Sequence, residues 1–413
     1  MNKKISPFAP KKFPKLPLVK GITISTAKSG TKYKGRKDIF TAVFVKGTTV
    51  AGAFTQSDVR AEPVEFCKKN IIDGSARVLV VNAGFANAFT GKKGKKINKS
   101  ISSNIKKIIK CREKDIFICS TGVIGENIPL RPTNKAISQS LKVLENKWES
   151  AAKSIMTTDT FPKATGKKIT IGNKEVSIVG IAKGSGMISP NMATMLAFIF
   201  TDALIDKTVL QTILNIELRN SFNAITVDSD TSTNDTVLAF ATGKAMTGKN
   251  ERIISRTSDS RLIKFREAFS EIMQDLAIQI VKDGEGAKKL IQIRVSGAEN
   301  TSSAKKIARS VANSPLVKTA VGASDPNWGR IIMAIGKANV KMNVKLLNLD
   351  IGSHKVIEKG ELIRNFNENN VKAYMKDDKI DILVDLNSGN KNFTAYTMDL
   401  TEKYIEINSD YRS

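Results

Sequence analysis

The chain has 413 residues, of which 41% are hydrophobic and 25% are charged. A chain of this length and composition is expected to form about two or three globular domains, which excludes a disordered protein and a small disulfide-stapled scaffold. Its 66 Lys and Arg residues exceed its 39 Asp and Glu residues, so the net charge is +27. Such a surface attracts anions of many kinds, but it does not by itself indicate a function.

Scarce residue types exclude several kinds of site. The chain has 1 His, His354, so a Ser/His/Asp triad or an HExxH zinc site would have to use that residue. Its 3 cysteines, Cys67, Cys111 and Cys119, are widely spaced and predict a reducing compartment rather than a disulfide framework or a metal site. The Pro-rich, basic residues 1–21 lack the apolar core of a signal peptide, and no run is long enough to span a membrane. We therefore expect a cytoplasmic protein with no membrane partner.

Strand-like runs alternate with amphipathic helices through most of the chain. Apolar strands are predicted around Leu79 and Phe117, each ending in a Gly-bearing turn. Residues 167–184 predict a hairpin with Gly172 and Asn173 at its turn, and the run from Met195 to Ala203 predicts a wholly buried strand.

Helices and a second domain are predicted further along. After Ser258, apolar residues recur at 3- and 4-residue spacing from Leu262 to Ile280, which predicts a helix that faces a sheet and ends near Gly284. A strand from Leu290 to Val295 and a helix from Ala304 to Val311 follow. The pattern indicates an α/β protein with a main catalytic domain over residues 1–286 and a smaller α/β domain over residues 287–413.

Two glycine-rich segments resemble phosphate-binding loops but miss essential residues. GKAMTGKN, which ends at Asn250, has an amide where the hydroxyl of Ser or Thr would hold magnesium. GSGMIS, which begins at Gly184, lacks the third glycine of a dinucleotide loop and is followed by Pro190. The lysine run at residues 91–100 has no interleaved aromatic residues to stack on bases, so we interpret it as a solvated surface and expect no nucleic-acid partner.

The stretch KGSGMISPNMATMLAFIFTDA places small and polar residues directly before a buried strand, with Thr194 at the junction. One interpretation is a glycine-rich loop that caps the strand. The other is chemical: a threonine released as a new N-terminus would carry its own base, because an α-amine titrates near ~7.7–8.0 and can accept the hydroxyl proton.

This stretch closely resembles the self-cleavage motif of the ornithine acetyltransferase family. Seven further blocks resemble the family in its order: STGVIGE, MTTDTFPK, TVDSDTSTNDT, VKDGEGA, ANSPLVKTA, SDPNWGRI and the terminal EINSDYRS. The resemblance covers essentially the whole chain. It implies a layered α/β sandwich of the self-processing ornithine acetyltransferase and aminopeptidase type.

The resemblance also implies the site residues. The chain would cut itself between Ala193 and Thr194, and Thr194 would then act as nucleophile. The Thr121 hydroxyl and the Gly122 backbone N–H would form the oxyanion hole. The resemblance assigns substrate binding to Thr157, Lys183, Thr194, Glu285, Asn408 and Ser413.

Simpler interpretations of several of these residues remain. Without the resemblance, Lys183 would be a surface lysine and Glu285 a carboxylate at a helix end. Asp228, Asp230 and Asp235 are interpreted as turn and cap residues, since the family needs no metal and no cofactor.

The sequence departs from the family pattern at two places. NAGFANAFTG stands where the family commonly reads closer to NSGNANACTG, so Phe85 replaces an amide. The chain ends at Ser413 where threonine is usual, which keeps the hydroxyl. We expect activity to survive both changes.

The resemblance therefore predicts a glutamate N-acetyltransferase of arginine biosynthesis that moves acetyl from N-acetylornithine to glutamate. Fragments 1–193 and 194–413 would associate as a heterotetramer with two copies of each. Some family members also use acetyl-CoA and thus make N-acetylglutamate directly, and the sequence does not distinguish the two types. The alternatives are a basic nucleic-acid-binding protein and a self-processing aminopeptidase of related fold.

Overall fold

The computed structural model describes residues 5–143, 145–189, 195–248 and 251–409. The chain divides into two compact units. One comprises residues 10–223 and 230–280, and the other comprises residues up to 9, residues 224–229 and residues from 281 onward. Each unit has its own sheet and its own apolar core. The division expected at residues 286/287 stays a prediction.

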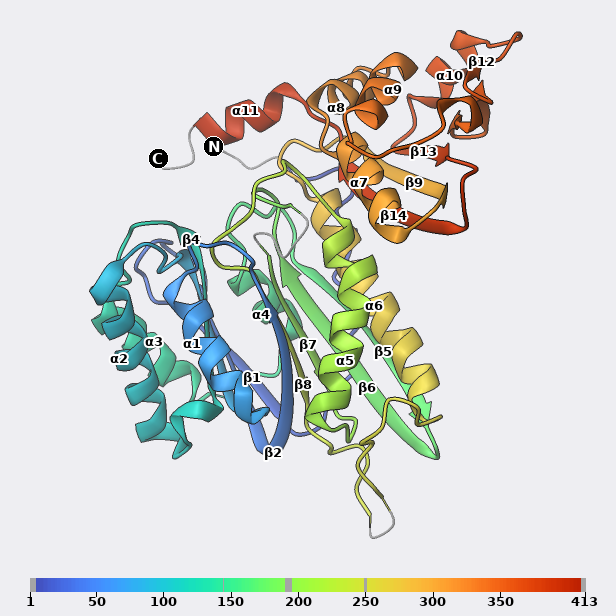
Figure 1. The fold of residues 1–413 in the computed structure, drawn as a ribbon. Coiled ribbons are helices and arrows are strands. Elements are labelled where there is room, and N and C mark those ends of the chain that lie inside the picture. Colours follow the sequence, from blue (N-terminus) through green and yellow to red (C-terminus); the bar gives the residue numbers. More distant parts are fainter. Residues whose placement is uncertain (1–4, 144, 190–194, 249–250, 410–413) are drawn as a thin grey trace. The chain divides into compact units, whose positions relative to one another are not determined.

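The larger unit is built on an eight-stranded sheet in the order β4-β3-β2-β8-β7-β6-β5, with β1 paired to β2 (Figure 1). Its strands are β1 (Ile22–Ala27), β2 (Ile39–Phe54), β3 (Ser75–Phe85), β4 (Ile116–Val123), β5 (Lys163–Ile171), β6 (Lys174–Lys183), β7 (Leu196–Thr201) and β8 (Thr236–Ala241). Its helices are α1 (Glu62–Asn70), α2 (Gly91–Ile109), α3 (Leu130–Ser140), α4 (Trp148–Ser154), α5 (Lys207–Glu217) and α6 (Leu262–Lys282), the last of which continues beyond residue 280.

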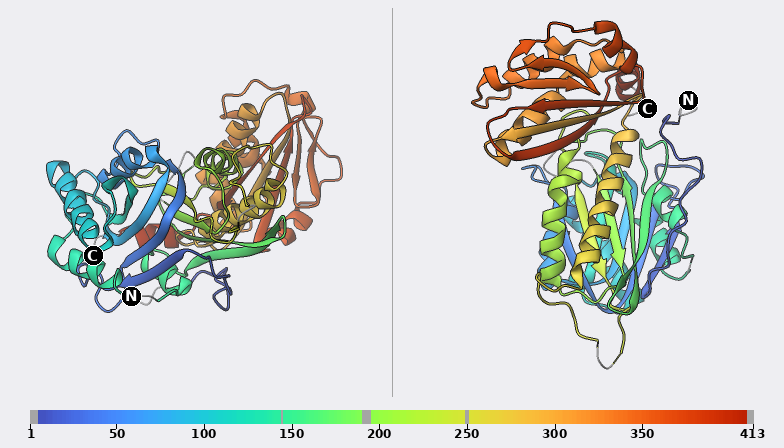
Figure 2. Two further views of the ribbon diagram at one scale, coloured as in Figure 1. Left: turned by 90° about the horizontal axis from the view of Figure 1, so that it is seen from below. Right: turned by 90° about the vertical axis from the view of Figure 1, so that its right-hand side faces the viewer.

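Helices cover both faces of this sheet around β6. Val179 and Ile181 belong to the apolar cluster that includes Ala151 of α4. Gly180, which lies between them in sequence and faces the other way, has Leu276 of α6 on its side, where an added Cβ would lie 2.6 Å from the leucine Cδ1. Figure 2 shows α5 and α6 side by side along one face of the sheet. Because both faces are covered, all six residues of β7 are buried, as the sequence predicts.

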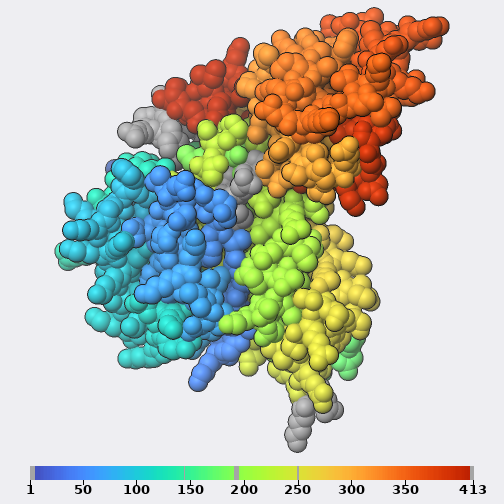
Figure 3. All heavy atoms as spheres, in the orientation of Figure 1, coloured from blue at the N-terminus to red at the C-terminus, as the bar shows by residue number. Residues whose placement is uncertain are grey.

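The predicted elements of this unit are confirmed in type. The hairpin at Gly172 joins β5 and β6, and the apolar stripe from Leu262 belongs to α6. The strand predicted from Met195 to Ala203 is shorter, Leu196–Thr201, because its two ends leave the ladder. Helices α1 and α2 form part of the outer surface in the space-filling view (Figure 3).

The smaller unit has a six-stranded sheet in the order β12-β11-β10-β13-β9-β14. Its strands are β9 (Leu290–Ala298), β10 (Asn348–Ile351), β11 (His354–Glu358), β12 (Glu361–Leu362), β13 (Lys379–Asp385) and β14 (Lys391–Met398). Its helices are α7 (Thr301–Ala312), α8 (Pro315–Gly322), α9 (Trp328–Gly336), α10 (Glu368–Tyr374) and α11 (Glu402–Ser409). Ile307 and Val311 of α7 are buried in one cluster with Ile291 and Ile293 of β9, so the predicted strand and helix form its core.

Candidate active site

Three strand ends meet where the predicted self-cleavage motif begins and ends. Lys183 is the last residue of β6, and it pairs with Leu196, the first residue of β7. Leu196 pairs on its other side with Thr236, the first residue of β8. The chain therefore leaves the sheet after Lys183 and re-enters it at Leu196, beside the same residue. The residues before and after the segment that contains the predicted cleavage bond are thus strand neighbours. Lys183 is buried, with 2% of its surface exposed, and is not the surface lysine of the simpler interpretation.

Asp235 holds Met195, the second residue after the predicted cleavage bond. The backbone N–H of Met195 donates to Asp235 Oδ1 at 2.9 Å, and the N–H of Thr236 donates to the Met195 carbonyl at 3.2 Å. Ala193 and Thr194 themselves lie outside the described residues. Asp235 is fully buried and lies in the loop directly before β8. Its interpretation from sequence as a turn or cap residue stays a prediction.

The environment of Asp235 disfavours its charged form. Burial raises the pKa of this carboxyl well above its usual range, against the opposing effects of the Met195 N–H, the Lys183 charge and the nearby Ser232 hydroxyl. Among the described residues, Asp235 Oδ2 accepts no hydrogen bond of ordinary geometry. A buried carboxyl with one unpartnered oxygen is more stable when that oxygen carries a proton.

Asp159 ties the Thr157 segment to the end of β6. Its Oδ1 accepts from Lys163 Nζ at 2.7 Å and from the Gly184 N–H at 2.7 Å, while its Oδ2 accepts from the Thr157 N–H at 2.9 Å. The Asp159 and Lys163 side chains are both 0% exposed. One carboxylate thus fixes the backbone at Thr157, a predicted substrate-binding residue, and at Gly184, which directly follows another, Lys183.

Asp159 is ionised despite its burial. Burial alone would raise the pKa of its carboxyl, but the charges of Lys163 and Lys183 and the hydrogen bonds from Lys163 and Gly184 outweigh it and hold the pKa well below its usual range. The sequence analysis did not single out Asp159 or Lys163. Their only signal is a carboxylate and an ammonium four residues apart in MTTDTFPK, and that spacing does not reveal burial.

Thr121 and Gly122 lie near the end of β4, beside β3. Gly122 pairs with Gly84 and has φ of +136°, a conformation that side-chain-bearing residues rarely adopt. A Cβ added at Gly122 would lie 2.1 Å from the Gly84 carbonyl carbon, so only glycine fits. Thr121 is buried, with 3% of its surface exposed.

Asn234 connects this strand end to the neighbourhood of Asp235. Its Nδ2 donates to the Ser120 carbonyl at 2.8 Å and to the Ala86 carbonyl at 2.6 Å. Ser120 immediately precedes Thr121, and Asp235 immediately follows Asn234. The dipeptide Asn234–Asp235 therefore contacts both the strand that carries the predicted oxyanion donors and Met195, two residues after the predicted cleavage bond.

Phe85, the departure from the family pattern, has a packing role. It is 7% exposed and belongs to an apolar cluster with Ile97 and Ile101 of α2. Its backbone pairs with Thr121 and Val123, and its carbonyl accepts from Asn82 Nδ2 at 2.9 Å. The ring is therefore accommodated by the core.

Glu285 and Asn408 belong to the smaller unit. Asn408 Nδ2, on α11, donates to Glu285 Oε2 at 2.8 Å, and Glu285 is 6% exposed. The same tail is fixed nearby by the Thr401 hydroxyl, which donates to the Gly286 carbonyl at 2.8 Å. These two predicted substrate-binding residues are thus brought together, whereas Ser413 lies outside the described residues.

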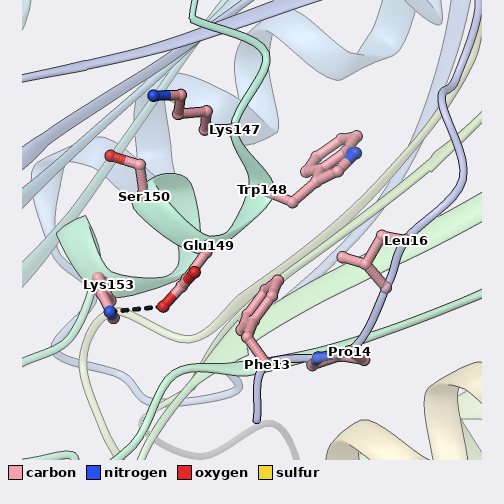
Figure 4. Close-up of a pocket in the computed structure, with 8 residues that line it drawn as sticks. All are labelled: Phe13, Pro14, Leu16, Lys147, Trp148, Glu149, Ser150 and Lys153. Atoms are coloured by element: carbon pink, nitrogen blue, oxygen red, sulfur yellow. Dashed lines mark hydrogen bonds and ion pairs between the residues drawn. The ribbon is translucent and has the colours of Figure 1, made fainter.

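A pocket of about 480 Å³ lies elsewhere in the larger unit, between the N-terminal segment and α4 (Figure 4). It is lined by Phe13, Pro14, Leu16, Lys147, Trp148, Glu149, Ser150 and Lys153. None of these is a predicted site residue.

In the part of the chain that the structure describes, no three His, Cys, Asp or Glu residues are grouped so that they could hold a metal ion. Within the described ranges, none of the helices has an apolar stretch that could span a bilayer.

A model of the ArgJ family matches residues 23–413. The chain belongs to the ArgJ family. The arginine biosynthesis bifunctional protein ArgJ of Mesorhizobium japonicum is 48% identical over 416 residues, and the match covers 100% of both chains. The protein of the same name from Brucella suis is 45% identical over 414 residues, again with 100% of both chains covered. A crystal structure of that protein from Bacillus halodurans is 39% identical, covering 51% of this chain and 97% of its own, with a TM-score of 0.48.

Family membership confirms the resemblance found in the sequence and the prediction of an acetyltransferase of arginine biosynthesis. The mixed α/β architecture with two sheets confirms the predicted fold class. The assignments of individual site residues stay predictions.

Proposed function

We propose that this chain is a cytoplasmic, bifunctional ArgJ enzyme that acetylates glutamate with either N-acetylornithine or acetyl-CoA as donor. The names of the relatives at 48% and 45% identity, which are called bifunctional, support the second donor. The chemistry proceeds through an acetylated Thr194 after self-cleavage, and it needs no cofactor.

Self-cleavage prepares the nucleophile. The Thr194 hydroxyl adds to the Ala193 carbonyl carbon, and collapse of the adduct breaks the C–N bond while the hydroxyl proton passes to the nitrogen. The resulting ester is hydrolysed by water to the Ala193 carboxylate and a free Thr194 hydroxyl. Thr194 then carries both a nucleophile and an α-amine, which serves as its base near neutral pH.

Acetyl transfer follows by two displacements. The Thr194 hydroxyl adds to the acetyl carbonyl and gives its proton to the α-amine, and the oxyanion accepts hydrogen bonds from the Thr121 hydroxyl and the Gly122 N–H. Ornithine leaves with that proton, or coenzyme A leaves as its thiol. The glutamate amine then attacks the acetyl-threonine and restores the hydroxyl, as N-acetylglutamate departs.

Charged groups of the chain suit amino-acid substrates. Lys183 can bind a substrate carboxylate, with Thr157 as a further hydrogen-bond partner. Glu285 can pair with an ammonium group, and Asn408 orients that carboxylate. Ser413, at the C-terminus, is the last of the proposed substrate-binding residues.

The observation that carries this proposal is a set of hydrogen bonds between buried side chains and the backbone before and after the predicted cleavage bond. Asp159 holds the start of the motif after Lys183, and Asp235 holds Met195 at its end. Asn234 connects Asp235 to the strand of Thr121. Preorganisation of this kind is what electrostatic stabilisation of an oxyanion requires.

We also propose the finer organisation. Residues 1–286 form the catalytic domain and residues 287–413 a second domain whose tail supplies Asn408 and Ser413. Fragments 1–193 and 194–413 stay associated, with two copies of each in the active enzyme.

The experiment is a donor and acceptor assay on purified enzyme. N-acetylornithine with glutamate should give N-acetylglutamate and ornithine in equal amounts, and acetyl-CoA with glutamate should give N-acetylglutamate and coenzyme A. Release of acetate from N-acetylornithine at saturating glutamate, with no N-acetylglutamate, would refute transferase activity. Hydrolysis of peptide amides with no acetyl transfer would favour the aminopeptidase alternative.

A further inference from the structure

Asp235 is a buried carboxyl that takes part in none of the chemical steps described above. Its Oδ1 accepts the Met195 N–H at 2.9 Å, and Oδ2 accepts no hydrogen bond among the described residues. The carboxyl is fully buried at the start of β8, directly beside the first residue of β7. A charge at this position would be expensive, because the carboxyl is fully buried and its Oδ2 accepts no hydrogen bond among the described residues.

The position of Asp235 in the chain gives its protonation state a consequence. The N–H that Asp235 accepts belongs to the peptide bond between Thr194 and Met195, and three covalent bonds separate its nitrogen from the α-nitrogen of Thr194, the proposed base. A carboxylate there would stabilise the ammonium form of that amine and lower the fraction of free base at neutral pH. A neutral carboxylic acid would not.

The charge of Lys183 also disfavours protonation of the proposed amine base. Lys183, on β6, is the charged side chain of the described residues that acts on the Asp235 carboxyl. Its positive charge disfavours a second positive charge nearby. Burial keeps the pKa of Asp235 raised in spite of Lys183.

We propose that Asp235 is a positioning residue that works as a neutral acid: one oxygen fixes the Met195 amide for cleavage at residues 193/194, and the other carries a proton. The neutral acid leaves the Thr194 amine unprotonated and able to act as base. The proposal rests on the proposed function, since it assumes that Thr194 is the nucleophile.

Two substitutions at Asp235 test this. Asp235→Asn keeps an acceptor for Met195 and a donor in the second position, so it imitates a neutral carboxylic acid. Asp235→Leu keeps the number and branching of the side-chain heavy atoms but removes both the acceptor and the donor. We expect the Asn variant to cleave within about threefold of the wild-type rate and the Leu variant to cleave about tenfold or more slowly, because the Met195 N–H loses its partner.

Asp202 provides a matched control at the other end of β7. It is 1% exposed, accepts backbone N–H groups from Ser177 at 2.7 Å and Lys20 at 3.1 Å, and its pKa is also raised by burial. Asp202→Asn and Asp202→Leu should lower the melting temperature as the Asp235 variants do and leave the cleavage rate of the folded protein unchanged.

Cleavage is followed on denaturing gels after synthesis, from the 45.0 kDa chain to its two fragments. An Asp235→Leu variant that cleaves as fast as Asp202→Leu would overturn the positioning role. If the Leu variant does not fold, Asp235→Asn decides alone: a folded Asn variant that cleaves more than about tenfold slowly would show that the charged carboxylate is needed.

The pH profile of acetyl transfer tests the protonation state separately. Asp235→Asn should leave the acid limb of the wild-type profile in place, because it replaces one neutral group with another. A limb displaced to lower pH would overturn the proposal, since it would show that a negative charge had been removed from beside the amine. A wild-type chain that neither cleaves nor transfers acetyl would refute the proposed function instead.

Discussion

The buried pair Asp159–Lys163 allows a quantitative test of how this site is held together. We choose Lys163→Met, which keeps the length of the side chain and removes its charge. The pair is separated by 2.7 Å with both side chains 0% exposed, so removing the lysine leaves a carboxylate without its closest cation. Breaking a buried pair in this way typically costs about 3–5 kcal/mol.

The chain contains a control with nearly the same geometry on its surface. Glu149 and Lys153 are also four residues apart and are separated by 2.6 Å, but their side chains are 50% and 58% exposed. An exposed pair contributes only about 0–1 kcal/mol, so Lys153→Met should change stability little. The comparison isolates burial as the cause of the difference.

The assay is urea unfolding of both variants in a Thr194→Ala background, in which the chain is expected to stay uncut. Both variants are measured at the same protein concentration, because association of two copies makes the stability depend on concentration. The Lys163→Met variant keeps the bonds from Asp159 to the Thr157 and Gly184 N–H groups, so its loss should fall on stability more than on binding of substrate.

The same pair predicts a dependence on pH. The folded pKa of Asp159 lies below its unfolded value of about 3.9, so its contribution is present above that pH and is lost as the pH falls toward the folded value. The cost of Lys163→Met should therefore shrink under acid. Equal losses for Lys163→Met and Lys153→Met at neutral pH would refute the reasoning.

Three further predictions each concern a single residue. Gly122→Ala should lower kcat by about tenfold or more with a smaller change in KM, because its Cβ would meet the Gly84 carbonyl carbon at 2.1 Å and displace a proposed oxyanion donor; steady-state kinetics decide this, and unchanged kcat would contradict the role. Asn408→Ala removes the 2.8 Å bond to Glu285 from an exposed helix, so it should raise KM by about fivefold or more with little change in melting temperature; a large loss of stability with normal KM would assign Asn408 to folding. Burial lowers the pKa of Lys318 to about 8, below its unfolded value of about 10.5, so the unfolded chain binds more protons between these values and the free energy of unfolding should rise from pH 8 toward pH 10.5; Lys318→Met should lose this rise, and an identical pH dependence in both proteins would contradict it.

Much of the fold could be predicted from sequence because the relevant signals are local. The wholly apolar run of β7 and the 3- and 4-residue spacing from Leu262 depend only on neighbouring residues. Thr121 and Gly122 were identified by resemblance, and the φ of +136° at Gly122 gives a physical reason for glycine there.

The anchors of the site could not be predicted, because they depend on strand register. Asp235 resembles any aspartate in a Ser- and Thr-rich turn until the pairing of Leu196 with Thr236 places its carboxyl against Met195. Asp159 and Lys163 read as an ordinary polar pair, and only the burial of both side chains shows that they are structural. The partners that these carboxylates hold across the sheet end, Met195 for Asp235 and Gly184 for Asp159, are distant in sequence.

The most direct test of the account is the intact mass of active enzyme incubated with N-acetylornithine in the absence of glutamate. We predict two polypeptides that end at Ala193 and begin at Thr194, with one acetyl group on the hydroxyl of Thr194 that disappears when glutamate is added. Fully active enzyme with an uncut chain, or with an acetyl group that glutamate does not remove, would contradict it.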